Sequence, residues 1–286
     1  MQILQTAGWE DYELLDTGEG MRLERFGKYR LVRPDPQIIW QPHLSHDEWA
    51  QADAIFDTES KSWINRTKVP ARWLMQYKGL SFWAELTPFK HTGVFSEQIL
   101  QWDWMAEKIK ASSRQPRILN LFGYTGLASL ACAQAGALVT HVDASKPTIA
   151  WAKENQAASG LSDKPIRWFL DDAIKFVQRE VKRGVKYDGF IMDPPVYGHG
   201  PNGERWDFTQ SFPQLLSGIK QLFSDQPLFM LINAYAISAS SLMLENTLMD
   251  IVPKKKNQIE VGELALEEKG SGRLLSTGIF GRWSIV

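Results

Sequence analysis

The stretch Arg117–Gly126, which reads RILNLFGYTG, decides the fold of this chain. Its apolar residues end in a turn that holds Gly123 and Gly126, and a helix-like stretch follows. About twenty residues further on, VTHVDAS forms a second apolar run, which ends on Asp143. In a doubly wound α/β sheet such glycines let the backbone approach an adenosine-containing ligand, and such an acid binds its ribose hydroxyls. The two segments together predict an α/β fold with an adenosine site.

Strand-like and helix-like patterns alternate along the rest of the chain. This alternation predicts a parallel sheet with helices on both faces, because parallel neighbours need crossover connections. The predicted strands are 117–122, 138–142, 166–170, 187–192 and 227–234, and the predicted helices are 126–136, 146–159, 173–183, 208–223 and 239–249. Two closing β-like runs, 259–268 and 274–285, predict an antiparallel pair at the sheet edge. The expected architecture is a Rossmann-like seven-stranded sheet.

The N-terminal part of the chain is rich in short apolar runs and turn signals. Residues 12–34 read as a meander, and residues 73–86 read as a hairpin that turns at Lys78-Gly79. A helix is expected over 96–113, with Ser96 as its N-cap. These patterns predict a small β-rich N-terminal domain over 1–90 and a second domain over 91–286.

Charge and cysteine content exclude several classes of protein. With 32 basic and 33 acidic residues the formal net charge is −1, which does not indicate the basic surface typical of nucleic-acid binding. Cys132 is the only cysteine, so neither an internal disulfide nor a multi-thiolate metal site can form. His43 and His46 alone do not make a metal site, so no metal is expected. The polar N-terminus and the lack of a long apolar run predict a cytoplasmic protein without a membrane segment.

The glycine turn limits which adenosine-containing ligand is expected. NAD and FAD need G-x-G-x-x-G, so that a pyrophosphate can lie on a helix N-terminus, but this turn is only G-Y-T-G. No lysine follows it as in a phosphate-binding P-loop. A ligand with ribose and adenine but no phosphates fits better, and S-adenosylmethionine (SAM) is such a ligand. The glycines alone would indicate no more than a tight βα turn, so Asp143 is needed for this interpretation.

Acidic residues also follow the third and fourth predicted strands. After the third strand, either Asp171 or Asp172 could accept a hydrogen bond from the adenine amine. A second interpretation is that both acids simply begin the helix 173–183, where they favour its positive end. The two interpretations are compatible, and the sequence does not choose between them.

The fourth predicted strand ends in Asp193-Pro194-Pro195-Val196-Tyr197. Two prolines force the chain out of the sheet in an extended path, which holds Asp193 at the edge where ligands bind. Tyr197 follows within reach of a planar substrate. The alternative is a rigid strand exit with a packed tyrosine, but the glycine turn and Asp143 favour the functional interpretation.

These segments resemble the class I SAM-dependent methyltransferases. More closely, they resemble the bacterial large-subunit ribosomal RNA methyltransferases of the cytosine-C5 and guanine-N7 branch. The motifs N-L-F-x-Y-T-G, V-D-x-S and D-P-P-x-F/Y of that family match NLFGYTG, VDAS and DPPVY here, and its K-x-T-G-x-F-x-x-Q stretch matches KHTGVFSEQ at 90–98. The resemblance covers about residues 75–286 and implies a class I methyltransferase sheet, SAM as cofactor and RNA as partner.

The resemblance also implies roles for individual residues. The glycine turn would line the methionine part of SAM, the Asp143 segment its ribose and the Asp172 segment its adenine, with the 90–98 segment closing over the cofactor. The implied cofactor-binding residues are Asn120, Phe122, Gly123, Tyr124, Thr125, Gly126, Asp143, Ala144, Ser145, Asp172, Ala173, Lys90, Phe95 and Gln98. The implied catalytic residues, which would face the methyl donor and the substrate, are Asp193, Pro194, Pro195 and Tyr197.

Three features depart from that family. Many members begin with an RNA-binding PUA domain, whereas the β-rich segment here corresponds only to the small domain that follows it, so the chain resembles a short form. Relatives that methylate cytosine C5 carry a cysteine after the fifth strand, where this chain reads LINAYAIS, so a covalent cysteine intermediate is not expected. The polar loop 198–207 is either a substrate lid, which we favour, or a mobile connection. Its candidate lid residues are His199, Asn202, Glu204 and Arg205.

The sequence thus predicts in-line transfer of a methyl group from SAM, with RNA as the expected acceptor. A protein or a small molecule is the second possible acceptor, which the near-neutral charge favours. A non-catalytic SAM- or RNA-binding module and a nicotinamide oxidoreductase are the remaining possible classes of protein. The intact D-P-P-x-Y motif argues against the binding module, and the missing third glycine argues against the oxidoreductase. The acceptor atom and the oligomeric state lie outside what the sequence indicates.

Overall fold

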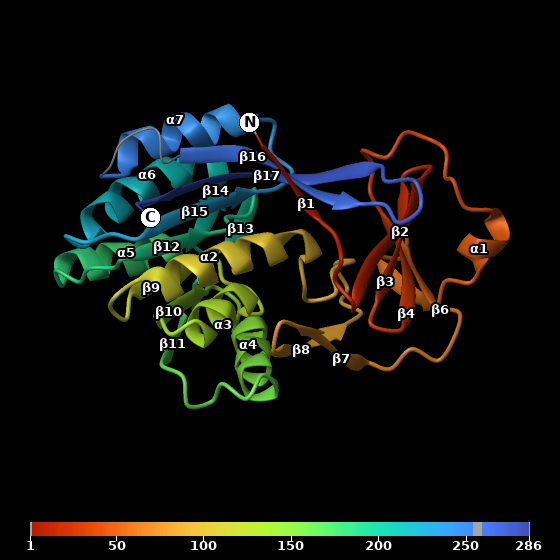
Figure 1. Cartoon of the computed structure of the whole chain (residues 1–286), viewed down its shortest axis with the longest axis horizontal. Helices are drawn as coiled ribbons and strands as arrows, with labels where there is room; N and C mark the ends of the chain where they lie inside the picture. Colours follow the sequence, from red (N-terminus) through yellow and green to blue (C-terminus); the bar gives the residue numbers. More distant parts are fainter. Residues whose placement is uncertain (1, 254–258, 286) are drawn as a thin grey trace. The chain divides into compact units, whose positions relative to one another are not determined.

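The computed structural model describes residues 2–253 and 259–285, and the chain divides into two compact units (Figure 1). The first unit comprises the described residues of Met1–Leu4, Leu100–Leu264 and Thr277–Val286. The second comprises Gln5–Ile99 and Ala265–Ser276, so it combines an N-terminal segment with a short segment from near the C-terminus. The expected domain boundary at residue 90 stays a prediction.

One large sheet forms the centre of the first unit, with the strand order β1-β16-β17-β15-β12-β9-β10-β11. The five strands from β15 to β11 run parallel to one another, and β17 pairs antiparallel with β15. The strands are β1 (Gln2–Thr6), β9 (Arg117–Leu121), β10 (Leu138–Asp143), β11 (Ile166–Leu170), β12 (Gly189–Met192), β15 (Phe229–Ala234), β16 (Ile259–Glu267) and β17 (Leu274–Ser284). The predicted parallel sheet with an antiparallel edge is confirmed.

Over residues 2–253 and 259–285 the sheet has one strand more than the seven that the sequence predicts. The additional strand is β1, which pairs with β16 at the edge of the sheet. Four of its five residues are exposed or only half-buried, so the apolar alternation that marks a half-buried strand is missing. An edge strand of this kind is stabilised by its backbone pairing, which the residue pattern does not reveal.

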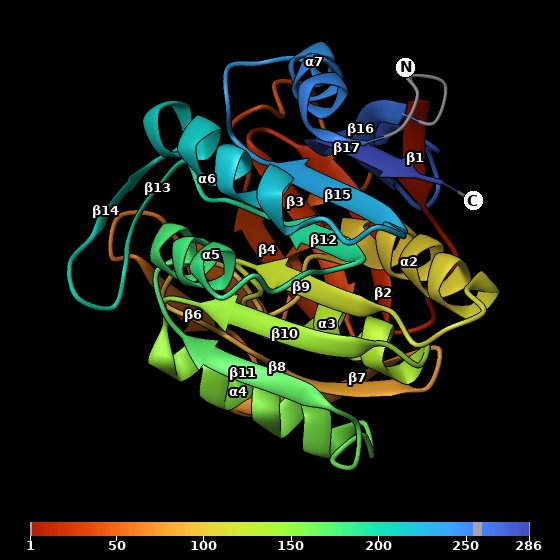
Figure 2. The ribbon, with the colours of Figure 1, turned by 90° about the vertical axis from the view of Figure 1, so that its left-hand side faces the viewer.

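Helices cover both faces of the sheet (Figure 2). In β10, His141 contacts Ser129 of α3, whereas the next residue, Val142, belongs to an apolar cluster shared with α5, α6 and α7. Because successive strand side chains point to opposite faces, α3 and the α5–α7 layer lie on opposite faces. The helices around this sheet are α2 (Ile99–Ala111), α3 (Leu127–Gln134), α4 (Lys146–Ala158), α5 (Ala173–Lys182), α6 (Phe208–Leu222) and α7 (Ser241–Ile251). The helices predicted from residue 126 onward are therefore confirmed, with ends that differ by at most two residues.

The second unit is built from antiparallel strands, with one parallel pair between β4 and β5. A five-stranded sheet has the order β2-β3-β4-β5-β6, and β7 and β8 form a separate pair. Its elements are β2 (Tyr12–Gly18), β3 (Met21–Phe26), β4 (Tyr29–Pro34), α1 (His46–Ala50), β5 (Ala54–Asp57), β6 (Ser62–Asn65), β7 (Arg72–Tyr77), β8 (Leu80–Glu85) and the 3₁₀ turn η1 (Ser96–Gln98). The predicted hairpin is confirmed, and its turn residues Lys78 and Gly79 have φ of 43° and 85°.

The expected N-cap at Ser96 is wrong. Ser96 is the first residue of η1, and α2 begins only at Ile99. The Ser96 hydroxyl is buried and makes no hydrogen bond with any described residue, so it does not cap either element. Within the described part of the chain, no helix combines the length and the apolar character that a membrane crossing requires.

Candidate cofactor and substrate site

The glycine turn follows the carboxyl end of β9, which lies between β12 and β10 in the sheet. Phe122, Tyr124 and Gly126 have positive φ values of 57°, 51° and 85°. Residues with a side chain rarely adopt such values, and the strain they carry is concentrated at ligand-binding segments. A Cβ at Gly126 would also lie 2.8 Å from the Cβ of Ala152, so only glycine fits there. The turn therefore has the constrained backbone expected of a ligand site.

A group of buried polar side chains supports this turn from the α3 face of the sheet. The Asn120 amide donates to the Ser129 hydroxyl at 2.9 Å, and that hydroxyl lies 3.0 Å from Nδ1 of His141. The His141 ring is fully buried. A Cβ at Gly123 would lie 2.3 Å from Cε1 of that ring, so the imidazole fills the space of a side chain at position 123. The sequence predicts no role for His141, although an ionisable residue inside an apolar strand was a usable signal.

Burial lowers the pKa of His141 from 6.5 to about 3, so the ring is neutral at neutral pH. Protonation would leave a charge in a fully buried site, where Nε2 of the ring has no hydrogen-bond partner among the described residues. The ring also lies against Trp168, with ring centroids 4.6 Å apart. His141 is therefore held as a neutral packing group behind the turn.

Asp143 is the last residue of β10, and its carboxylate organises the segments on either side of it. Oδ2 accepts the backbone N–H of Tyr124 at 2.9 Å, and Oδ1 accepts the N–H of Ser145 at 2.8 Å and the hydroxyl of Thr148 at 3.0 Å. A carboxylate offers about four acceptor positions, so about one is left for a ribose hydroxyl. Asp143 thus holds the turn and the start of α4 in addition to its expected role. Ala144 lies between it and Ser145, the N-cap of α4.

Asp172 is the N-cap of α5, and its Oδ1 accepts the N–H of Lys175 at 2.9 Å. Asp171 forms an ion pair with Arg179 and accepts the N–H of Asp172. Both acids therefore act at the start of α5, as one of the two interpretations expected. Ala173 is the first residue of that helix. The contact of Asp172 and Ala173 with adenine stays a prediction.

The residues after β12 leave the sheet as the two prolines predict. Asp193, Pro194 and Pro195 lie between the end of β12 at Met192 and the short strand β13 (Tyr197–His199). The indole Nε1 of Trp206 donates to the Pro195 carbonyl at 2.6 Å. The same ring lies against Phe122, with centroids 4.8 Å apart. Trp206 therefore links the strand exit to the glycine turn. The sequence did not identify this residue, although a tryptophan within a polar loop was a usable signal.

The 198–207 loop forms a small ribbon. β13 pairs antiparallel with β14 (Arg205–Asp207), in the register Tyr197↔Asp207, Gly198↔Trp206 and His199↔Arg205. Lys175 of α5 donates to Glu204 at 2.5 Å, and this bond lowers the pKa of Glu204 to about 2. The segment is thus paired with itself and joined to α5. Its interpretation as a substrate lid stays a prediction, as does the alternative of a mobile connection.

Three further expected cofactor residues, Lys90, Phe95 and Gln98, belong to the second unit. Lys90 has φ of 59°, and its ammonium donates to the Pro34 carbonyl at 3.1 Å. Burial lowers its pKa, and the nearby Arg22 guanidinium adds to this effect. Phe95 lies against the His91 ring, and Gln98 is buried at the end of η1. Their closure over the cofactor stays a prediction.

Cys132 lies in α3 and is fully buried. Its thiol is 4.0 Å from the sulfur of Met105, and burial raises its pKa well above the ordinary range. Because the thiolate is the nucleophilic form of cysteine, this residue is packed as an inert apolar group.

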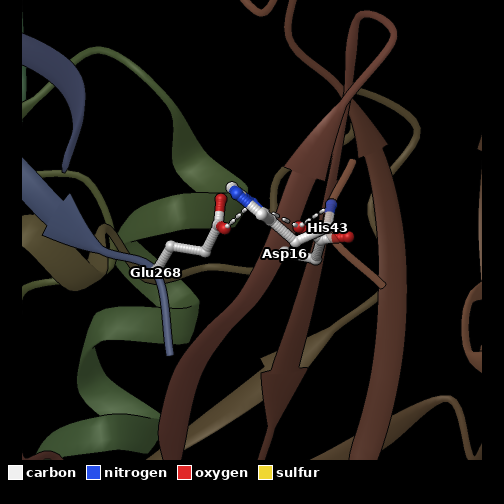
Figure 3. A group of neighbouring side chains, drawn as sticks. All are labelled: Asp16, His43 and Glu268. Carbon is white, nitrogen blue, oxygen red and sulfur yellow. Dashed lines mark hydrogen bonds and ion pairs between the residues drawn. The ribbon is translucent and has the colours of Figure 1, made fainter. Parts of the chain in front are cut away.

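A second polar cluster lies in the second unit, where His43 meets Asp16 and Glu268 (Figure 3). These residue types can bind a metal ion, but their atoms already form a complete hydrogen-bond network. Nδ1 of His43 is 3.0 Å from Glu268, and its Nε2 is 3.2 Å from the Arg273 guanidinium, which can only donate. Nδ1 therefore carries the proton and donates it to Glu268, while Nε2 accepts a hydrogen bond from Arg273. A metal ion bound at Nδ1 would require the proton to lie on Nε2, where this N–H would face the N–H groups of Arg273. Asp16 also accepts N–H groups of residues 43 and 44 and the indole of Trp49.

This network is structural in character, because it joins β2, the loop before α1 and the segment after β16. The sequence shows only that His43 lies near His46 along the chain, and it gives no sign of the contacts of His43 with Asp16 and Glu268. Because Glu268 is 225 residues away along the chain, no local pattern could have shown the pairing.

Comparison with known proteins places these observations in a family. Residues 54–258 match the S-adenosylmethionine-dependent methyltransferase family, and the chain belongs to it. The crystal structure of the SAM-dependent methyltransferase from Agrobacterium tumefaciens is 40% identical, with a TM-score of 0.93 over 99% of this chain and 93% of that chain. The expected class I methyltransferase fold and SAM as cofactor are confirmed.

Curated relatives include the ribosomal RNA large subunit methyltransferases K/L of Shewanella. The protein of Shewanella frigidimarina (strain NCIMB 400) is 32% identical over 148 residues, and that of Shewanella baltica (strain OS155 / ATCC BAA-1091) is 35% identical over 148 residues. Each match covers 51% of this chain and 20% of the relative. The chain thus spans about a fifth of the length of these relatives.

The donor set at the sheet edge fits SAM. The N-terminus of α3 follows Gly126, which provides no side-chain cap, so backbone amides there suit the carboxylate of the methionine part. Asp143 keeps acceptor capacity for a ribose hydroxyl. Neither position offers the lysine or the third glycine that a phosphate-bearing cofactor needs. SAM brings to such a site a methyl group that is already activated on a sulfonium.

Proposed function

We propose that this SAM-dependent methyltransferase methylates RNA, with ribosomal RNA as its substrate class. The observation that carries RNA as the acceptor is the similarity to the ribosomal RNA large subunit methyltransferases K/L of Shewanella. The link from the glycine turn through Trp206 to the Asp193-Pro194-Pro195 exit supports methyl transfer at this edge of the sheet, because it joins the expected cofactor segment to the expected substrate segment. A cytoplasmic location is part of the same proposal.

The transfer proceeds without a covalent cysteine intermediate. Cys132 is buried in α3 with a raised pKa, and the strand β15 is followed by Tyr235-Ala236 rather than by a cysteine. The protein's contribution is then to position the acceptor in line with the methyl group and to exclude water. Such a mechanism suits a nitrogen acceptor, which needs little acid–base assistance.

Asp193 is the proposed acceptor-orienting residue. Placed after β12, its carboxylate accepts a hydrogen bond from an acceptor amine, directs the nitrogen lone pair to the methyl group and stabilises the cation that forms. Replacing Asp193 by Ala is expected to lower kcat strongly while SAM affinity changes little. An Asp193→Ala protein that binds SAM and turns over at the wild-type rate would remove this role.

The experiment for the function is incubation of the purified chain with radiolabelled SAM and total RNA, ribosomal subunits or protein extract. Label in ribosomal RNA, followed by nucleoside analysis, is the expected result. Label only in protein or small molecules would show that the acceptor is not RNA. SAM binding without label in any fraction would also contradict RNA methylation.

A further inference from the structure

The ribbon formed by β13 and β14 has two different faces. Paired residues of an antiparallel ribbon point to the same side, so Tyr197, His199 and Arg205 share one face. All three are exposed, and Tyr197 is 74% exposed. Gly198 and Trp206 form the opposite face, and Trp206 is buried. We call the side with Tyr197, His199 and Arg205 the outer face.

Contacts on the inner side and at the tip hold this ribbon in place. Trp206 packs on Phe122 and donates to the Pro195 carbonyl. At the tip, Glu204 accepts from Lys175 and from the N–H of Asn202. The outer face is therefore preorganised, and a ligand that binds it does not have to order the loop.

The charges on the ribbon are distributed unevenly along it. Asp207 lies beside Tyr197, but its carboxylate accepts the Thr209 hydroxyl at 2.6 Å and the Gln210 N–H at 3.1 Å at the start of α6. At the other end, His199 and Arg205 are paired across the ribbon and offer an exposed guanidinium beside an imidazole. The outer face thus presents an aromatic ring at one end and a basic group at the other.

We propose that the outer face binds one unpaired nucleotide of single-stranded RNA, with its base stacked on Tyr197 and its phosphate at Arg205 and His199. Tyr197 and His199 are about 7 Å apart along the strand. The base and the phosphate of one nucleotide can therefore reach Tyr197 and His199 at the same time. Bases can stack on a side chain only when they are unpaired, which selects loops and single strands over duplex. This inference rests on the proposed function and names the form of RNA that the same site accepts.

The test measures RNA binding by the full chain saturated with S-adenosylhomocysteine. The probes are a fluorescent single strand of about 12 nucleotides, within the usual site size, and its duplex. The variants are Tyr197→Ala, Tyr197→Phe and Arg205→Ala, and Lys182→Ala on the exposed side of α5 is the matched control. Calorimetric SAM affinity and melting temperature of each variant show whether the cofactor site and the fold are intact.

Tyr197→Ala is expected to weaken single-strand binding about 5- to 100-fold, whereas Tyr197→Phe stays close to the wild type because it keeps the ring. Arg205→Ala is expected to reduce the slope of log affinity against log salt by about 0.7, the value for one phosphate contact on a single strand. Lys182→Ala changes neither quantity, and the duplex binds more weakly than the single strand.

Two outcomes separate the inference from the function on which it rests. If the wild type methylates RNA but Tyr197→Ala and Arg205→Ala bind the single strand with unchanged affinity and salt slope, the outer face is not the nucleotide site. If the wild type binds SAM but neither binds nor methylates RNA, both the proposed function and this inference are wrong.

Discussion

Replacing Gly123 by Ala tests how the glycine turn is supported. The added Cβ would lie 2.3 Å from Cε1 and 2.4 Å from Nδ1 of His141, whereas ordinary contact begins near 3.4 Å. The ring is fully buried between the turn, Ser129 and Trp168, so it has no free space into which it can move. Overpacking of this kind costs about 1–3 kcal/mol. Because φ of Gly123 is not positive, the backbone adds no penalty of its own.

The assay is urea or thermal unfolding combined with calorimetric titration of SAM. For a chain of this size about 1–3 kcal/mol corresponds to a fall in Tm of roughly 2–5 °C. SAM affinity is expected to fall as well, because relief of the clash moves the turn that is predicted to contact the cofactor.

The matched control is the same substitution in a His141→Ala background. There the new Cβ faces a cavity, so Gly123→Ala should cost close to nothing, which gives a coupling energy of about 1–3 kcal/mol. A Gly123→Ala protein with wild-type stability and SAM affinity, or additive effects in the double variant, would refute the clash with His141.

Three further predictions concern the same unit. Trp206→Phe removes the hydrogen bond to the Pro195 carbonyl but keeps a ring against the glycine turn, so kcat should fall while SAM affinity is retained. Trp206→Ala removes both contacts and should lower both kcat and SAM affinity. Steady-state kinetics and calorimetric titration of SAM measure the two quantities. The pKa of His141 is about 3 in the folded chain, against 6.5 for a free histidine, so below pH 6.5 the unfolded chain binds a proton that the folded chain does not. The free energy of unfolding should therefore fall below pH 6.5, by at most about 1.4 kcal/mol per pH unit. Unfolding experiments on His141→Asn should no longer show this fall. Burial alone would raise the pKa of Asp188, but the hydrogen bonds from Arg114 and its other donors outweigh burial and lower the pKa below 3.8. These hydrogen bonds therefore stabilise the fold at neutral pH, and their contribution is lost as the pH falls through 3.8 and below. Asp188→Asn should therefore cost about 1–3 kcal/mol in unfolding experiments at pH 7 and show no such loss in acid.

The order of the helices and the parallel strands could be predicted from sequence because their signals are local. Buried parallel strands read as continuous apolar runs, and the glycine turn and the two prolines restrict the backbone over a few residues. These local features are enough to place the glycine turn, Asp143 and Asp193 after the carboxyl ends of three predicted strands. The exposed strand β1 could not be predicted in this way, because edge pairing leaves no apolar pattern.

Contacts between distant residues were decided by the tertiary structure alone. His141 fills the space beside Gly123, Trp206 joins Phe122 to Pro195, and Glu268 meets His43 across 225 residues. Each contact depends on how strands and loops approach one another in space, and this approach has no counterpart in the spacing of residues along the chain. The sequence by itself determined which segments form the sheet edge, and the packing of that edge determined which side chains hold it in shape.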